Sequence, residues 1–278
     1  MAEMAILITC HNRKEQTLAC LRRVYNQQIT LDVYLVDDGS KDGTLDAVAN
    51  EFPQTIILSG DGNLFWNQGM HKAWALAAKN NYAYYIWLND DTIIEECALK
   101  KMLIYSQKLN DEAIICAAIK DPEKEQFTYG PKDENKISIL PNGKLQPGVT
   151  FMNGNFVLVP KKVYDVIGNL DPIFHHDIGD FDYGLRALKA GIIIYATPEY
   201  MGVCTANDRA VNKVRMPKSD IFGRFKRLYS PLGYNPKLQF AYIKRHWGLL
   251  AATIDFIKVH LINIVGDDLF SLYERLKN

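Results

Sequence analysis

The stretch "LDVYLVDDGS", residues 31–40, is an apolar segment that ends in two carboxylates, a glycine and a serine. Residues 42–52 follow it with the spacing of a helix. This order of strand, polar turn and helix recurs along the first part of the chain. It predicts an α/β fold with a mostly parallel sheet covered by helices on both faces. The predicted strands here are residues 4–9, 31–38, 54–60, 82–90 and 113–119, and the predicted helices are residues 14–27, 42–52, 67–81 and 94–109.

The regular alternation stops at residues 121–148, which are polar and rich in turn residues, with a hairpin-like "PNGK" at 141–144. A strand, a helix and a strand then resume the pattern, at residues 155–160, 161–168 and 192–197. A basic loop and apparent helices follow. We therefore expect two domains, an α/β domain of residues 1–207 and a mostly helical extension of residues 208–278.

Polar residues gather where four of the predicted strands end. In open α/β sheets, ligands bind beyond the carboxyl ends of the parallel strands. These clusters are therefore candidates for one shared binding site. They are "TCHNR" at 9–13, "DDGS" at 37–40, "GDGN" at 60–63 and "NDDT" at 89–92.

Two adjacent carboxylates, Asp90 and Asp91, follow an apolar run. Close like charges repel, and burial penalises both. A hard cation such as Mg²⁺ or Mn²⁺ would offset that repulsion, since it takes oxygen ligands from one or two carboxylates plus substrate phosphates. The alternative is a helix N-terminus, where acids complement the helix dipole, and this fits Glu95 and Glu96 better.

The earlier strand ends carry residue types suited to a nucleotide. The acids Asp37 and Asp38, which precede Gly39 and Ser40, can accept hydrogen bonds from a base or ribose. The alternative is an ordinary turn, where Asp and Gly are common. His11 can stack on a base, and Arg13 can pair with phosphate. The alternative for residues 9–13 is a capped helix start in which Arg13 is exposed to solvent.

The stretch "GDGNLFWNQGMHKAW", residues 60–74, opens with a glycine-rich turn and leads into a helix. Its backbone amides can face an anion. It is not a P-loop, because Gly-Lys-Ser/Thr is missing. We expect Asn63 and Gly69 to line a ligand and Trp66 to be partly buried.

The stretch "HHDIGDFDYGLRALKAG", residues 175–191, is dense in acids near a predicted helix start. One of them can serve as a general base, and the alternative for Asp180 and Asp182 is helix capping. The paired histidines lack the Cys or HExxH partners that would favour zinc. Arg186 is predicted to pair with an acid on the same helix.

The 278 residues are 48% hydrophobic and 23% charged, which allows a large core. Thirty-two basic and 32 acidic residues cancel, so no net field favours a nucleic acid or an acidic substrate. The five cysteines are far apart and form no CxxC pair, which predicts a reduced, cytoplasmic protein. The N-terminus lacks a signal-peptide pattern, and no apolar run reaches the length of a spanning helix.

The C-terminal segment is basic and aromatic and then becomes apolar. One interpretation is an amphipathic element on a membrane surface. The alternative is a helical pair that packs on the body or on a second subunit, as in a homodimer. Its basic residues up to His260 are Arg209, Lys213, Arg215, Lys218, Arg224, Lys226, Arg227, Lys237, Lys244, Arg245 and Lys258, against the acids Asp220 and Asp255.

Together these pieces, over residues 4–205, resemble a family 2 glycosyltransferase with a GT-A fold, the inverting type that uses a nucleotide-sugar. "ILITCHNR" is similar to the family's first strand and T-x-Tyr-Asn-Arg turn, with His11 in the place of Tyr. "LVDDGSKDGT" is similar to VDDGS-T-D-GT, and "WLNDDT" lies where the DxD motif belongs. "FMNGNFVLVPKKVYDVIGNLDPIF" and "GDFDYGLRALKAG" resemble two later motifs. The likeness is greatest to the rhamnosyl- and glycosyltransferases of bacterial surface polysaccharide.

The resemblance implies a role for individual residues. His11 with Thr9 would border the nucleobase, and Asp38 would accept from the pyrimidine ring NH. Asp91 would hold Mg²⁺ or Mn²⁺, and Asp180 would be the base that deprotonates the acceptor. The implied donor-binding set is Thr9, His11, Asn12, Arg13, Asp38, Asn63, Trp66, Gly69, Asn89 and Asp90.

Three positions depart from the family pattern. Gly179 stands where Glu often precedes the catalytic Asp. Asn89 stands in the place of the first Asp of DxD. No His occurs in "EYMGVCTAND", residues 199–208, where many relatives complete their metal site.

The resemblance implies an inverting, metal-dependent enzyme that moves a sugar from a UDP- or dTDP-sugar to a saccharide or lipid-linked saccharide in cell-surface polysaccharide synthesis. It would act in the cytoplasm, with or without peripheral contact at the inner face of the membrane. One alternative is a sugar-1-phosphate nucleotidyltransferase, but "ITCHNRKEQ" lacks the glycines of its phosphate loop. The other is a catalytically silent sugar- or partner-binding relative, against which Asp38, Asp91 and Asp180 argue.

Overall fold

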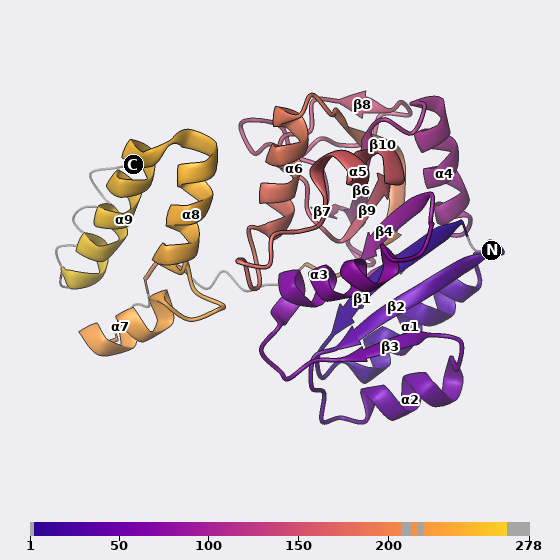
Figure 1. The fold of residues 1–278 in the computed structure, drawn as a ribbon, viewed down its shortest axis with the longest axis horizontal. Coiled ribbons are helices and arrows are strands. Elements are labelled where there is room, and N and C mark those ends of the chain that lie inside the picture. Colours follow the sequence, from indigo (N-terminus) through magenta and orange to yellow (C-terminus); the bar gives the residue numbers. More distant parts are fainter. Residues whose placement is uncertain (1–2, 207–212, 216–218, 266–278) are drawn as a thin grey trace. The chain divides into compact units, whose positions relative to one another are not determined.

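A computed structural model describes residues 3–206, 213–215 and 219–265 (Figure 1). The chain divides into two compact units, Met1–Ala206 and Asn207–Asn278. The first is built on one central sheet flanked by helices, and the second is helical where it is described.

Strands and helices alternate along the first unit, as the sequence pattern predicts. The strands are β1 (Met4–Cys10), β2 (Leu31–Asp37), β3 (Ile56–Ser59), β4 (Tyr84–Leu88), β5 (Ile93–Ile94), β6 (Ile114–Lys120), β7 (Phe127–Tyr129), β8 (Gln146–Pro147), β9 (Phe156–Pro160) and β10 (Ile194–Val203). The helices are α1 (Lys14–Tyr25), α2 (Thr44–Glu51), α3 (Phe65–Ala77), α4 (Ala98–Lys108), α5 (Lys161–Ile167) and α6 (Gly179–Lys189).

The fold is α/β, as predicted, and its sheet is mixed. Among the described strands, four pairings are parallel, and the five that involve β5, β7, β8 or β9 are antiparallel. The strand order is β3-β2-β1-β4-β9-β6-β10-β5, with β7 beside β6 and β8 beside β10. β9 runs antiparallel to both of its neighbours, β4 and β6. The short strands β5, β7 and β8 were not predicted, because two or three residues are too few to show a period.

Helices cover both faces of the sheet. Successive strand residues point to opposite faces, so Ile6 and Ile8 of β1 pack with α1, α2 and α4. Ala5 and Leu7 of the same strand pack with α3, α5 and α6. Burial on both faces explains why the strands are continuous apolar runs.

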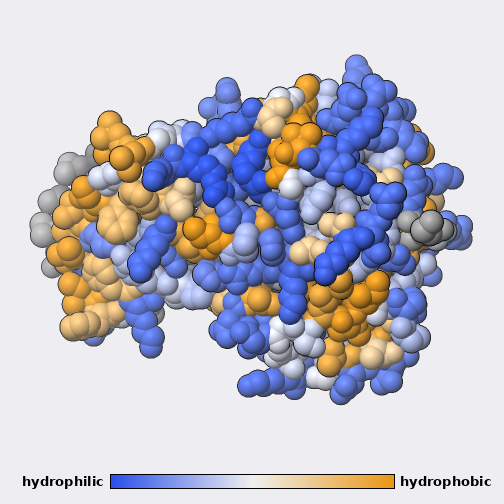
Figure 2. Space-filling model, in the orientation of Figure 1, coloured by the Kyte–Doolittle hydropathy of each residue, from blue (hydrophilic) through white to orange (hydrophobic). Residues whose placement is uncertain are grey.

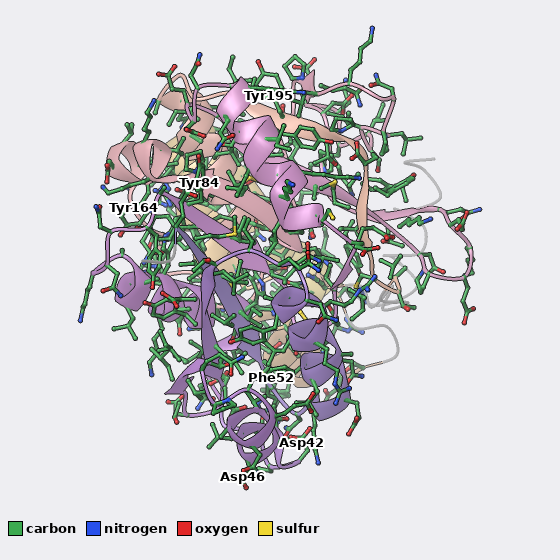
Figure 3. All side chains as sticks on the ribbon, turned by 90° about the vertical axis from the view of Figure 1, so that its right-hand side faces the viewer. Asp42, Asp46, Phe52, Tyr84, Tyr164 and Tyr195 are labelled. Carbon is green, nitrogen blue, oxygen red and sulfur yellow. The ribbon has the colours of Figure 1, made fainter. Side chains whose placement is uncertain are left out.

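The turn between β2 and α2 is tied to the start of α1 by Asp42. Its carboxylate accepts from the backbone N–H of Lys14 at 3.0 Å and from the Thr44 hydroxyl at 2.5 Å. Asp42 and Asp46 lie at the outer edge of the unit beside α2 (Figure 3). The contacts fix one end of the loop that carries the strand-end acids of β2.

The second unit contains α7 (Ile221–Leu228), α8 (Pro236–Trp247) and α9 (Leu249–Ile264). Phe240 of α8 packs edge-to-face on Phe256 of α9. The buried Arg224 and Arg215 donate to the carbonyl oxygen of Val265, at 2.8 and 3.0 Å. Cations at a helix C-terminus complement its dipole, so these two arginines hold the end of α9 in place.

Candidate active site

The polar strand ends lie at one edge of the central sheet. β1, β2 and β4 are adjacent parallel strands, so the residues that follow Cys10, Asp37 and Leu88 meet at their carboxyl ends. The antiparallel β9 begins at the same edge, because Phe156 pairs with Leu88. Segments far apart in sequence thus share one site.

Asp38 is buried and holds the loop that follows β3. Its Oδ1 accepts from the N–H of Gly62 at 2.8 Å, and its Oδ2 accepts from the N–H of Phe65 at 2.9 Å. The exposed His11 places its Nδ1 2.5 Å from the Asp38 carbonyl oxygen. Each carboxylate oxygen has a second lone pair, so acceptance from a pyrimidine NH stays a prediction that the geometry allows.

Asn12 ties the loops after β1 and β2 together. It adopts a left-handed backbone conformation with φ 51°. Its Oδ1 accepts from the N–H of Lys41 at 2.7 Å, and its own N–H donates to Ser40 Oγ at 2.9 Å. Asn63 is exposed on the loop after β3. Donor contacts of Asn12 and Asn63 stay predictions.

Thr9 and Gly69 lie against each other where α3 packs on β1. A Cβ at Gly69 would overlap the Thr9 hydroxyl, and both residues are buried. Their observed role is the close packing of α3 on the sheet, and a contact of either with a donor stays a prediction.

The guanidinium of Arg13 bridges the two adjacent acids after β4. Its Nη1 lies 2.6 Å from Asp91 Oδ2 and 3.2 Å from Asp90 Oδ1. Asp90 is 5% exposed, and its Oδ2 has no hydrogen-bond partner among the described residues. Burial raises the pKa of Asp90 to about 7, although Arg13 acts in the opposite direction. A cation from the protein itself therefore offsets the repulsion between the acids.

Cys204, directly after β10, contacts one acid of this pair, Asp91. β5 pairs antiparallel with β10, and this returns the chain that follows Asp91 to the end of β10. The Cys204 Sγ donates to Asp91 Oδ1 at 3.6 Å. Burial first and Asp91 second raise the pKa of this thiol to about 12, so it is protonated at neutral pH. No role was predicted for Cys204, which lies in the stretch where many relatives carry a His.

These residues could hold a divalent cation with few protein ligands. The described part of the chain holds no group of three or more His, Cys, Asp or Glu that could bind a metal. Asp91 is the more accessible acid, with a side chain 20% exposed against 7% for Asp90. Mg²⁺ and Mn²⁺ are commonly bound by one or two carboxylates together with substrate phosphates. Asp91 would therefore hold such an ion together with a diphosphate.

Trp66 connects the acid pair to a second part of the site. Its Nε1 donates to Asn89 Oδ1 at 2.8 Å. Its ring lies against Gly154, where a Cβ would overlap it. The Asn89 N–H in turn donates to the carbonyl oxygen of Asn155 at 2.9 Å. The first position of the "NDD" triplet thus positions an aromatic ring.

Asp180 lies in the first turn of α6, beside Gly154. Its Oδ2 accepts from the Gly154 N–H at 3.0 Å, and its Oδ1 accepts from the Phe181 N–H at 2.8 Å. Burial raises the pKa of Asp180 to about 6 in spite of these two hydrogen bonds. A carboxylate with a pKa near neutrality is suited to general base catalysis.

The residue before Asp180 is constrained by α3. Asn67 is fully buried, and its Nδ2 donates to the carbonyl oxygens of Asp171 and Phe174, both at 2.8 Å. Its Oδ1 fills the space that a Cβ of Gly179 would need. Gly179 therefore stands in the place of the usual Glu because any larger residue would collide with Asn67.

Asp182 has a structural role. It is fully buried, and its Oδ2 accepts from Arg186 Nε at 2.9 Å, which confirms the predicted pairing on one helix. Arg186 also donates to the carbonyl oxygens of Ile167 and Asn169. Because Asp182 is buried in its ion pair with Arg186, Asp180 is the candidate base in the stretch of residues 175–191.

Solved structures with a similar fold include two of TarS and one of a mannosyltransferase. A structure of Staphylococcus aureus TarS 1-349 has a TM-score of 0.59 at 12% identity, and the match covers 95% of this chain and 71% of that one. The mannosyltransferase PcManGT from Pyrobaculum calidifontis, in complex with GDP-Man and Mn²⁺, has a TM-score of 0.58 at 13% identity, over 91% of this chain and 73% of that one. A longer TarS structure is covered over 53% of its length, with a TM-score of 0.58 at 14% identity. At these identities the likeness shows the fold.

The family itself is shown by sequence. The family model of glycosyl transferase family 2 matches residues 5–168, more than half of the chain. The chain therefore belongs to glycosyltransferase family 2, and this membership supports a role in glycosyl transfer. A search of curated proteins found no match. Within residues 3–206, 213–215 and 219–265, no helix is both long and apolar enough to cross a membrane.

Proposed function

We propose that this chain is an inverting glycosyltransferase that moves a sugar from a UDP- or dTDP-sugar to a hydroxyl of a saccharide or lipid-linked saccharide. One observation carries the proposal, the contact path from Asn89 through Trp66 and Gly154 to Asp180. The path joins acids suited to a bound diphosphate and a base suited to an acceptor in one continuous set of contacts. Family membership supports the transfer itself.

Asp180 would be the catalytic base. Its carboxylate takes the proton from the acceptor hydroxyl while that oxygen forms a bond to the anomeric carbon. The bond from this carbon to the diphosphate breaks on the opposite face, so the configuration inverts. The N–H groups of Gly154 and Phe181 keep the carboxylate oriented. With a pKa of about 6, Asp180 is mostly ionised at neutral pH and still accepts a proton readily.

Arg13 and Asp91 would receive the departing nucleoside diphosphate. A guanidinium is charged at every physiological pH and its planar fork matches phosphate oxygens. Asp91, with Asp90 buried behind it, would hold Mg²⁺ or Mn²⁺, and such an ion stabilises negative charge on the leaving group as a Lewis acid. Nη1 contacts both acids, and Nε and Nη2 of the same guanidinium carry three further N–H groups that can donate to a phosphate.

The loops after β1, β2 and β3 would form the nucleoside end of the site. The exposed His11 offers a ring for stacking on the base, and Asp38 offers lone pairs to an imide NH, which uracil and thymine both carry. Thr9, Asn12 and Asn63 complete this end.

We assign this activity to the domain of residues 1–207 and place it in the cytoplasm, in cell-surface polysaccharide synthesis. The resemblance of the motifs to those of polysaccharide glycosyltransferases supports this context. Residues 208–278 form the proposed extension.

Release of nucleoside diphosphate from a panel of nucleotide-sugars, with Mn²⁺ and a mixture of saccharide acceptors, tests the proposal. We expect release by the wild type and almost none by Asp180→Asn, with Asp165→Asn on exposed α5 as the matched control. Exchange of pyrophosphate into a nucleoside triphosphate would overturn the proposal in favour of a nucleotidyltransferase. Donor binding without turnover on a competent acceptor would favour a silent relative.

A further inference from the structure

The outer face of α9 is apolar along its whole length. Five branched aliphatic side chains on this face are between 52% and 75% exposed. Their spacing of three or four residues places them on one stripe of the helix, about 21 Å long at 1.5 Å per residue. The α9 stripe consists of Leu250, Ile254, Ile257, Leu261 and Ile264.

The opposite face of α9 is the one that packs inside its own unit. Ala252, Val259 and Asn263 are buried there, and Phe256 packs on Phe240 of α8. If packing inside this unit were the only role of α9, its solvent-facing side would be polar. Figure 2 shows hydrophobic residues gathered over this helical unit. An exposed apolar surface of this extent marks an interaction site.

The unit that carries the α9 stripe is basic where it is described. Lys258 lies four residues after Ile254 and three before Leu261, so it borders the stripe on the helix surface. Both acids in the described part of this unit have internal roles: Asp255 accepts from the Tyr234 hydroxyl at 2.8 Å, and Asp220 accepts from the Gly223 N–H at 2.7 Å. Among residues 213–215 and 219–265, the exposed basic residues are Lys213, Lys226, Lys237, Lys244, Arg245 and Lys258.

We propose that the α9 stripe docks on an anionic lipid surface, with α9 lying in the plane of the membrane interface. An apolar helix face with a lysine at its border, in a unit whose exposed charges are mostly basic, is suited to insert into the headgroup region and to attract acidic lipids. α9 has 16 residues, about 24 Å, which is shorter than the hydrocarbon core of about 30 Å. Trp247, 51% exposed at the end of α8 and separated from α9 by Gly248 alone, is a residue type that favours the membrane–water boundary.

The charges favour lipid over a second copy of this chain as the occupant. A symmetric dimer through the α9 stripe would bring two copies of this basic unit together, with Lys258 at the border of each stripe. Like charges that face each other across an interface oppose binding, whereas acidic headgroups complement them. This inference rests on the proposed function only in that docking would bring the enzyme to lipid-linked acceptors.

Flotation of the full chain with vesicles tests the docking surface directly. We expect the wild type to float with vesicles of phosphatidylcholine and phosphatidylglycerol at least roughly tenfold more than with phosphatidylcholine alone, and less at high salt. Ile254→Glu combined with Ile257→Glu should lower binding on the order of 100-fold, because two apolar side chains leave the interface. Lys258→Glu should lower binding to the anionic vesicles only.

The matched control is Val166→Glu, an exposed apolar residue of α5 in the first unit, which should float like the wild type. Unchanged thermal unfolding shows that each variant is folded. Equal flotation of wild type and the α9 double variant would overturn the proposal. So would a wild type that ignores vesicles and is a dimer by light scattering, converted to a monomer by the α9 variant. These vesicles contain no sugar donor, so failure here leaves sugar transfer untouched.

Discussion

Arg13 and Asp91 form an ion pair at the carboxyl edge of the sheet, with Nη1 2.6 Å from Oδ2. The same nitrogen lies 3.2 Å from Asp90. Arg13 therefore occupies a place beside Asp91 that a divalent cation would also favour. Two cations at one carboxylate repel each other, so the arginine and the metal ion are expected to compete.

Removal of Arg13 should strengthen metal binding. In Arg13→Ala the charge of Asp91 is no longer offset, so we expect Mn²⁺ to bind roughly tenfold more tightly and to raise Tm more than in the wild type. Thermal unfolding with and without Mn²⁺ measures this. The added Asp91→Asn substitution should abolish the shift, and equal shifts in wild type and Arg13→Ala would refute the competition.

The rate of transfer should fall in acid because Asp180 must be ionised to accept a proton. With the pKa of Asp180 raised to about 6 by burial, kcat/KM is expected to fall about tenfold per pH unit below that value and to be flat above it. Asp180→Asn should lower kcat on the order of 10³-fold and lose this acid limb. If the residual activity of Asp180→Asn still fell in acid as the wild-type activity does, another group would be responsible for the loss of rate at low pH.

We expect Asp182 to contribute to the stability of the fold and not to the catalytic step. Asp182→Asn removes one partner of a buried ion pair with Arg186, and we expect a loss of about 3 kcal/mol in the free energy of unfolding. Urea unfolding measures it. The exposed pair of Lys161 with Asp165 is the control, where Asp165→Asn should cost less than about 1 kcal/mol. A stable Asp182→Asn protein that is inactive would contradict this division of roles.

Gly179 and Asn67 should be coupled. Gly179→Ala is expected to cost about 1–3 kcal/mol through overlap with the Asn67 side chain. In the Asn67→Ala background the same change should cost less, with a coupling energy of at least about 1 kcal/mol in a double-mutant cycle. Additive effects in urea unfolding would show that the overlap is relieved elsewhere. Gly179→Glu, the residue frequent in relatives, should be the most damaging change at this position.

Much of the fold could be predicted from the sequence, because parallel strands buried on both faces are continuous apolar runs that stop at polar turns. The central strands and the helices between them follow from this pattern. The antiparallel direction of β9 could not be predicted, since a run such as "FVLVP" has no sign of direction. For this reason the sequence does not predict the roles of Gly154 and Asn155, which directly precede β9.

The residue types of the candidate site could be predicted from the sequence, but their contacts could not. Asp38, Asp91 and Asp180 belong to recognisable motifs. The bridge by Arg13 depends on the pairing of β1 with β4, and the contact of Cys204 depends on how β5 returns to β10. β5 has only two residues, which is too short to be recognised in the sequence. The pairing of Arg186 with Asp182 was predictable because four residues along a helix place side chains together.

The configuration of the product tests the central claim most directly. The account has one base, Asp180, and a displacement in which the new bond forms opposite the bond that breaks. With a donor that the enzyme accepts, proton NMR of the glycoside formed should therefore show the anomeric configuration opposite to that of the donor from the first turnover. A product that retains the donor's configuration would contradict the account.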